Sequence, residues 1–224
     1  MTQEHNKDRV YFVELDVDIG FSTYEPFLQF LSVEKRDKIL KFHFDIDKKL
    51  SVASDLFIRY LACQYLNVNN SELRFGRNEY GKPFLVDVDD FHYNISHTRN
   101  AITVGVSQTP IGVDVERIRG FQNAIVKRFF SKKEKQYVEA DNENSSKRFY
   151  EIWTKKEAYV KWIGEGLSIP LRSFDVLADP MSCCLETVQI DNYAVSICRT
   201  ENRYLSVCSD IKEESLWQKW KSLC

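Results

Sequence analysis

The sequence predicts an α+β fold, because patterns typical of strands and of helices occur in both halves of the 224-residue chain. These patterns do not alternate in the regular strand–helix–strand order that a parallel sheet requires. Hydrophobic residues make up 43% of the chain and aromatic residues 13%. A chain of this length and composition can bury one large core, or two smaller cores that share an interface.

In the first half, alternating or β-branched patterns indicate strands at residues 10–16, 91–96 and 101–106. Ser32 can cap a helix that begins at Val33. Apolar residues then recur at helical spacing from Asp47 to Leu66. The segment YGKP at 80–83 is typical of a turn, since glycine and proline interrupt regular structure.

In the second half, the pattern predicts strands at residues 111–116, 173–177, 185–190, 193–198 and 204–208. Helices are predicted at residues 127–130, 131–137 and 148–163, and near Trp217 and Trp220. Ser131, followed three residues later by Glu134, forms a capping-box pattern at the start of one of these helices. Gly164 and Gly166 are expected to stop the helix that ends at 163.

Composition and motifs argue against several functions. The net charge is −2, so no overall field attracts nucleic acid or an anionic membrane. The sequence contains no apolar run of membrane-spanning length, no secretory signal, and no glycine-rich nucleotide-binding fingerprint. The six cysteines form no C-x-x-C pair; they are Cys63, Cys183, Cys184, Cys198, Cys208 and Cys224. We therefore expect a cytoplasmic protein with reduced, buried thiols.

Two carboxylates, Asp114 and Glu116, lie two residues apart in IGVDVE at 111–116. Residues two apart on a strand point to the same face, so the acids project together while Val113 and Val115 are buried on the other face. Like charges in this position repel unless a cation, or a basic partner, lies between them. Magnesium suits such a place, because it accepts a few carboxylates together with waters and phosphates. Two solvated acids on an edge strand would give the same pattern.

A second candidate cluster lies in WTKKEAYVK at 153–161. Trp153, Glu157 and Lys161 recur every four residues and therefore share one face of a helix. Taken alone, this spacing is explained more simply by an ordinary surface ion pair between Glu157 and Lys161.

Two short segments are candidates for contact with a ligand. NISHT at 94–98 ends a predicted strand, and Ser96 and His97 are better placed for hydrogen bonds to a phosphate or sugar than for nucleophilic catalysis. In YGKP at 80–83, the proline stiffens the turn and the glycine allows a close backbone approach, which would hold Lys82 in a defined place. A loop histidine and a plain turn, neither with a function, would also account for these segments.

In combination and in this order, these segments resemble the 4′-phosphopantetheinyl transferase superfamily, and within it the larger surfactin-synthetase-activating (Sfp-type) group. The resemblance runs from about residue 10 to residue 210. It rests on SVEKRDKILKF at 32–42, YGKP at 80–83, NISHT at 94–98, IGVDVE at 111–116, RFFSKKE at 128–134 and WTKKEAYVK-WIGEGLSIPL at 153–171. Each segment is a weak signal alone, whereas chance does not explain the ordered set.

The resemblance implies two similar α+β halves in a pseudo-two-fold arrangement, with coenzyme A in the cleft between them. The sequence breaks at 108–110, so the halves are expected at 1–108 and 109–224. The first half would carry the basic helix with the YGKP and NISHT motifs, and the second the acids and the catalytic helix. One chain would then supply the whole site, and we expect a monomer.

The resemblance also implies an enzyme that transfers the 4′-phosphopantetheine moiety of coenzyme A to a serine of apo peptidyl or acyl carrier proteins. Such transfer releases adenosine 3′,5′-bisphosphate and activates carrier proteins, as in nonribosomal peptide and antibiotic biosynthesis. Asp114, Glu116 and Glu157 match the acidic ligands of magnesium or manganese. Glu157 also matches the candidate base for the carrier serine, and Lys161 the lysine beside the leaving group.

Other matching positions contact coenzyme A in the family: Lys35, Lys38, Lys82, Pro83, Ser96, His97 and, in the catalytic motif, Lys156. One position departs from the family. An arginine for the 3′-phosphate usually lies on the second helix, where this chain has Leu50 beside Lys48 and Lys49. Either a neighbouring lysine substitutes for the arginine, or the 3′-phosphate is held less well, because a lysine lacks the bidentate fork of arginine.

Carrier proteins of this kind are usually small, acidic helical bundles. Phe129, Phe130, Lys132 and Lys133 are therefore expected to contact the carrier, with basic side chains surrounding apolar anchors. A solvated helix with its phenylalanines in the core is an equally good interpretation. Two other functions stay open: a non-catalytic member that only binds coenzyme A or a carrier, and a magnesium phosphotransferase with a small acceptor.

Overall fold

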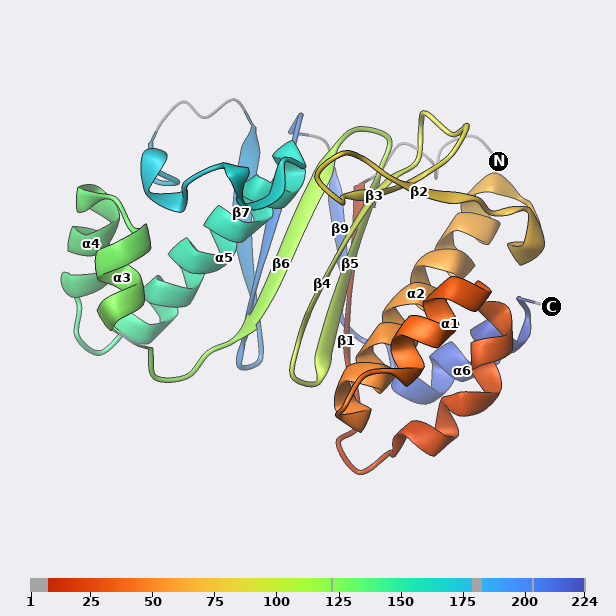
Figure 1. Ribbon diagram of the computed structural model, residues 1–224. Coiled ribbons are helices and arrows are strands. Elements are labelled where there is room, and N and C mark those ends of the chain that lie inside the picture. The colour runs from red at the N-terminus through yellow and green to blue at the C-terminus, as the bar shows by residue number, and fades with distance from the viewer. Residues whose placement is uncertain (1–7, 122, 179–182, 203, 224) are drawn as a thin grey trace.

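The computed structural model describes residues 8–121, 123–178, 183–202 and 204–223 (Figure 1). Its helices and strands form two mixed units, on the right and the left of Figure 1, whose sheets lie side by side in the middle of the molecule. This arrangement confirms the predicted α+β class. No helix in the described ranges has the length and apolar character needed to cross a membrane.

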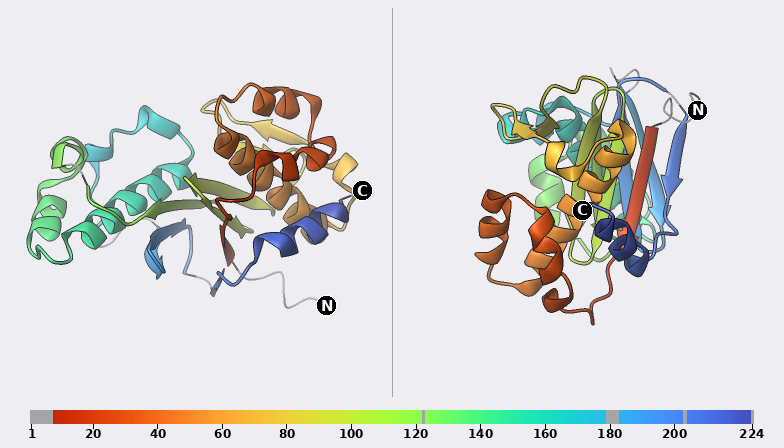
Figure 2. Two further views of the ribbon diagram at one scale, coloured as in Figure 1. Left: turned by 90° about the horizontal axis from the view of Figure 1, so that it is seen from below. Right: turned by 90° about the vertical axis from the view of Figure 1, so that its right-hand side faces the viewer.

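The first unit is built on a four-stranded sheet with the order β4-β5-β1-β9. Its strands are β1 (Asp8–Glu14), β4 (His92–Thr98), β5 (Ala101–Ser107) and β9 (Leu205–Cys208). Strand β1 pairs antiparallel with β5 and parallel with β9. One side of this sheet is covered by the helices α1 (Val33–Leu40), α2 (Asp45–Leu66) and α6 (Glu213–Lys221) (Figures 1 and 2). A small hairpin of β2 (Phe75–Arg77) and β3 (Pro83–Leu85) lies at the upper edge of the unit.

The second unit is built on an antiparallel sheet with the order β6-β8-β7. Its strands are β6 (Ile111–Arg117), β7 (Cys184–Ile190) and β8 (Tyr193–Arg199), and its helices are α3 (Asn123–Phe129), α4 (Lys132–Glu139) and α5 (Ser145–Ile163). Helix α5 packs along β6 and β8, while α3 and α4 lie at its N-terminal end (Figure 1). Single 3₁₀ turns complete the chain at Phe21–Thr23, Glu25–Phe30, Asn70–Glu72, Gly166–Ser168 and Leu171–Ser173.

Local signals placed most of these elements correctly. The Ser32 side chain caps α1, and Ser131 forms the predicted capping box with Glu134 at the start of α4. The strand predicted at 173–177 is wrong. That segment has no neighbouring strand; instead its backbone groups bind buried side chains, the Phe174 carbonyl accepting from Lys156 and the Val176 amide donating to Glu134.

The C-terminal tail returns to the first unit. Strand β9 extends the sheet of β1, and Leu216 and Trp220 of α6 are buried in the same core as α2. Glu213 is buried beside Lys49, with its carboxylate 3.4 Å from the ammonium, and accepts a hydrogen bond from Tyr24. A cut at 108–109 therefore does not divide the chain into two self-contained units, because the tail stabilises the N-terminal one.

A shared apolar cluster joins the two sheets. Val113 and Val115 of β6 are almost completely buried there against Val10 and Phe12 of β1, as the alternation of IGVDVE predicted. The two sheets are thus held as a fixed pair. The cysteines in the described residues are free, with Cys63 and Cys198 buried and three others half-buried; Cys224 lies outside the described residues.

Candidate functional site

The site lies where β4 and β6, strands of different sheets, run next to each other. Three side chains of β4, two residues apart, reach β6: Asn94 accepts from the Val113 amide (3.0 Å), Ser96 donates to Asp114 (2.7 Å) and Thr98 donates to Glu116 (3.1 Å). The predicted NISHT and IGVDVE motifs, 17 residues apart in the chain from Asn94 to Ile111, therefore form one surface.

Helix α5 brings the third motif to this surface. Gly112 permits the close approach, since a Cβ at that position would lie 2.1 Å from the Ala158 carbonyl oxygen. The Lys161 ammonium donates to Asp114 Oδ1 at 2.7 Å and to Ser96 Oγ at 2.9 Å. The ion-pair partner of Lys161 is thus Asp114 of strand β6 rather than Glu157, the glutamate one turn earlier on its own helix.

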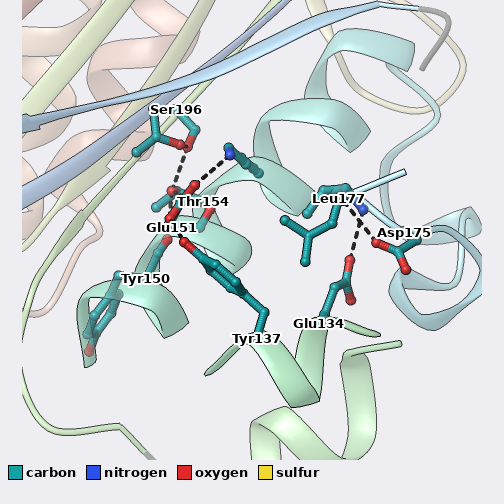
Figure 3. A network of polar contacts seen from close by, with 11 residues as sticks. Glu134, Tyr137, Tyr150, Glu151, Thr154, Asp175, Leu177 and Ser196 are labelled. Carbon is teal, nitrogen blue, oxygen red and sulfur yellow. Dashed lines mark hydrogen bonds and ion pairs between the residues drawn. The ribbon is translucent and has the colours of Figure 1, made fainter. Parts of the chain in front are cut away.

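A buried polar network fixes α5 in this position (Figure 3). The Thr154 and Ser196 hydroxyls lie 2.7 Å apart and tie the helix to β8. Tyr137 donates to Glu151 at 2.7 Å and ties the helix to α4. Because Thr154 lies one turn before Glu157, these contacts fix the position of Glu157 along the sheet.

The three predicted metal ligands lie close enough to repel one another. Burial raises the pKa of Glu157, and the Asp114 carboxylate raises it further; burial and Asp114 act in the same directions on the pKa of Glu116. Asp114 is only 5% exposed, and its Oδ2 is a buried acceptor without a hydrogen-bond partner. An unsatisfied buried carboxylate oxygen of this kind is unfavourable unless a cation or donor reaches it.

These residues suit a magnesium ion. Their donor atoms are carboxylate oxygens, which magnesium prefers, and a cation would satisfy Asp114 Oδ2 and relieve the repulsion of Glu116 and Glu157. Across the described ranges, no group of three or more histidine, cysteine or acidic side chains is placed so that it could hold a metal ion. The described site therefore offers ligands from a strand and a helix rather than a finished cage.

The predicted coenzyme-binding residues divide between two sides of β4. Ser96 is buried and points to the acids, whereas His97 is exposed on the side of α1. The surrounding protein partly desolvates His97, and this burial, together with the nearby Lys161 and Lys35 ammonium groups, lowers the pKa of the imidazole. The imidazole of His97 therefore experiences positive charge from both α5 and α1.

A cavity of about 230 Å³ lies between α1, α2 and the β2–β3 hairpin. Its lining includes Lys35, Lys38 and Pro83, three of the predicted coenzyme-binding residues, together with Arg59 and Arg77. Lys35 forms an ion pair with Asp55 at 3.3 Å, and Lys38 is exposed. The tertiary structure therefore gathers four basic side chains around one small cavity.

Lys82 has its ammonium at the end of α5. Its Nζ donates to the Trp162 carbonyl at 3.0 Å, and burial lowers the pKa of Lys82 to about 8. Leu50 is buried in the core of the first unit, and Lys49 is bound there to the Ile19 carbonyl at 3.1 Å and to Glu213. Lys49 therefore cannot take the place of the missing arginine, while Lys48 is paired with Asp45 at 2.9 Å.

Two predicted contacts conflict with the structure. Lys156 is fully buried, where its ammonium binds Glu134 at 2.9 Å and the Leu171 carbonyl at 2.7 Å, which argues against contact with the coenzyme. Phe130 is fully buried in the core of the second unit, stacked on Phe149, so it is not an anchor for a carrier protein. In both cases neighbours distant in the sequence decided that the side chain packs inward.

Three residues of the site received no separate role in the sequence analysis: Asn78, Asn94 and Thr98. The spacing of Asn94, Ser96 and Thr98 repeats the two-residue spacing of Asp114 and Glu116, and matching periods of this kind were an available signal. Asn78 has no such signal, because its partner on α5 lies 86 residues away.

Comparison with known proteins agrees with this geometry. A family model described as "4′-phosphopantetheinyl transferase, N-terminal" matches residues 21–109, and one described as "4′-phosphopantetheinyl transferase superfamily" matches residues 110–208. The chain is 32% identical to 4′-phosphopantetheinyl transferase Sfp of Bacillus subtilis (strain 168) over 204 residues, covering 85% of this chain and 91% of that protein. It is 36% identical over 164 residues to 4′-phosphopantetheinyl transferase gsp of Aneurinibacillus migulanus, covering 73% and 68% respectively. It is 28% identical over 222 residues to 4′-phosphopantetheinyl transferase ffp of Bacillus subtilis, covering 93% and 99%.

Proposed function

The chain belongs to the 4′-phosphopantetheinyl transferase superfamily and is an enzyme of that class, and we propose that the β4–β6–α5 site carries its reaction. The enzyme transfers the 4′-phosphopantetheine moiety of coenzyme A to a serine of apo carrier proteins and releases adenosine 3′,5′-bisphosphate. The observation that supports this site most directly is the buried Asp114 Oδ2 without a partner, next to Glu116, Glu157 and Lys161.

Asp114, Glu116 and Glu157 are the side chains that would hold magnesium or manganese. When bound, the metal ion supplies Lewis acidity and neutralises charge on the pyrophosphate. Glu157 accepts the proton of the carrier serine, directly or through water, and its raised pKa favours proton transfer near neutral pH. The Lys161 ammonium stabilises the negative charge of the departing bisphosphate.

The cavity beside α1 suits the adenosine end of coenzyme A. Lys35 and Lys38 would attract the 3′-phosphate, Pro83 would contact the base, and His97 would donate to the phosphates between the two sides of β4. The hydroxyl of Ser96 is already engaged by Asp114 and Lys161, so its part is to orient them, with any phosphate contact coming second.

Carrier proteins would dock on the surface defined by Phe129, Lys132 and Lys133. The two lysines are exposed, and Phe129 is partly exposed against Trp153. An acidic helical partner would complement this basic rim. Because one chain supplies every group of the site, we expect a monomer; a cytoplasmic location and independence from nucleic acid stay predictions from the composition.

Intact-mass measurement of an apo carrier protein incubated with this chain, coenzyme A and magnesium tests the function. We expect the carrier to gain the mass of one phosphopantetheine arm, and EDTA to abolish the gain. Several apo carriers without a gain, while coenzyme A still binds, would instead support a non-catalytic binding member. A gain that persists in EDTA would contradict the proposed metal ligands.

A further inference from the structure

The end of helix α5 is closed by the other unit of the molecule. A helix leaves its last carbonyl groups without partners inside the helix. Here the Trp162 carbonyl accepts from Lys82 Nζ at 3.0 Å, and the Gly164 carbonyl accepts from Asn78 Nδ2 at 2.9 Å. Both donors come from the turn between β2 and β3, about 80 residues earlier in the chain.

Asn78 also builds the turn that presents these donors. Its Oδ1 accepts from the amides of Tyr80 at 3.0 Å and Lys82 at 2.8 Å, around Gly81, whose φ is +88°. One side chain thus folds the turn with its oxygen and joins it to α5 with its nitrogen. The oxygen and nitrogen of an amide cannot be exchanged here, because the turn offers two donors and the helix offers an acceptor.

The fit between turn and helix is close. Gly164 has a φ of +83°, and a Cβ there would lie 2.7 Å from Lys82 Cδ. The Lys82 ammonium lies at the negative end of the helix dipole, where a cation is favourable. The same turn borders the proposed coenzyme cavity through Arg77 and Pro83.

We propose that Asn78 and Lys82 are positioning residues that fix the last turn of α5 and thereby hold Lys161 on Asp114. Lys161 directly precedes Trp162, whose carbonyl Lys82 binds, so a shift of that turn displaces the Lys161 backbone. The ammonium of Lys82 acts through the helix, whereas Arg77 and Pro83 of the same hairpin line the proposed coenzyme cavity. The effect on catalysis rests on the proposed function, whereas the effect on the helix does not.

The sharpest variant is Asn78→Asp, which keeps an acceptor for the Tyr80 and Lys82 amides and loses the donor to Gly164. We expect kcat to fall about tenfold, the value of one hydrogen bond lost at a positioning contact, without an equal rise in the KM for coenzyme A. Gln189→Glu is the matched control, because Gln189 donates to the Asp191 carbonyl in an exposed turn of the second unit. It should leave kcat unchanged. An unchanged kcat in Asn78→Asp would overturn the proposal.

A double-mutant cycle separates positioning from general damage. If Asn78 acts through Lys161, Asn78→Asp should lower kcat little further once Lys161→Ala is present. If Asn78→Asp lowers kcat by the same factor in the unsubstituted protein and in the Lys161→Ala variant, the proposal is overturned. Lys82→Met, which keeps the apolar stem against Gly164 and removes the donor to Trp162, gives a second test should Asn78→Asp fold poorly, and it should show the same non-additivity.

Hydrogen exchange tests the contact even if no carrier protein is modified. In Asn78→Asp, amides at residues 161–164 should exchange faster than in the unsubstituted protein, while the first turns of α5 keep their protection. Equal exchange at 161–164 would overturn the proposal whatever the activity. Faster exchange in a chain without transferase activity would instead leave the contact in place and count only against the proposed function.

Discussion

Two of the lysine–carboxylate pairs on helix α5 have similar lengths but differ in burial and in how many of their polar atoms have partners. Lys156 and Glu134, 2.9 Å apart, are both fully buried. The Lys156 ammonium also binds the Leu171 and Phe174 carbonyls, and Glu134 also accepts from the Val176 amide. In this pair the bonding capacity of the lysine is filled.

Lys161 and Asp114, 2.7 Å apart, are less completely enclosed. The Lys161 side chain is 27% exposed, and Asp114 Oδ2 has no partner although it is buried. Burial raises the pKa of Glu157 and Glu116, and the nearby Asp114 carboxylate raises both further. The comparison teaches that a saturated buried pair has no group left for a ligand and that losing one of its partners should cost stability, whereas a pair with a spare acceptor and an accessible cation can still bind a ligand.

The largest expected effect is the loss of kcat in Glu157→Gln, a variant of the residue next to the unsaturated Lys161–Asp114 pair. The variant removes the proposed base, and kcat should fall by about 10²–10⁴-fold, more than the KM for coenzyme A rises. Stability should not fall at pH 7, because Glu157 has a raised pKa and its charged form is disfavoured in the fold. Steady-state kinetics and urea unfolding measure both quantities. An effect confined to KM would contradict the base role.

In the saturated pair of Lys156 and Glu134, the variant Lys156→Met should lower the stability of the fold. It leaves the Glu134 carboxylate buried and without its cation, at a cost of about 3–5 kcal/mol in the free energy of unfolding. Lys155→Met is the control, because Lys155 pairs with Glu151 on the same helix at a partly exposed place and should cost about 0.3–0.5 kcal/mol. Adding Glu134→Leu to Lys156→Met should recover part of the loss. Equal urea midpoints for the two single variants would break the comparison.

The same distinction applied to α2 predicts weak recognition of the 3′-phosphate. Lys49 is a saturated, buried lysine like Lys156 and does not replace the arginine absent at Leu50, while Lys48 already has Asp45 as an ion-pair partner. We expect the KM values for coenzyme A and 3′-dephospho-coenzyme A to lie within about tenfold, equivalent to about 1.4 kcal/mol. Lys38→Ala removes an exposed cation of the cavity and should make these two KM values more similar. Strong rejection of the dephospho form would show another cation in the arginine's place.

The smallest effect is expected at the carrier surface, where the lysines are exposed. Reversing two charges with Lys132→Glu and Lys133→Glu should raise the KM for the carrier several-fold at low salt and less at high salt, because exposed charges are screened. The KM for coenzyme A should not change. Lys221→Glu, an exposed position on α6 in the other unit, is the control. If all three substitutions have equal effects, this surface is not the docking site.

Local and periodic features were predicted well from the sequence. The strand of Asp114 and Glu116, the buried side of Val113 and Val115, and the capping box of Ser131 and Glu134 depend on neighbours within a few residues, and the structure confirms them. The ordered motifs by themselves also indicated the 4′-phosphopantetheinyl transferase superfamily. The metal, the carrier surface and the roles of Glu157 and Lys161 stay predictions.

The sequence by itself determined which residue types this protein brings to its chemistry, because strand alternation and helical spacing are local properties of the chain. Only the tertiary structure decided which of these side chains remain accessible to a ligand. Lys156 and Lys161 stand in the same motif, yet Glu134 saturates one and Asp114 leaves the other accessible. That difference depends on burial and on partners 22 and 47 residues away, and no local pattern encodes the desolvation or the hydrogen bonds that such partners impose.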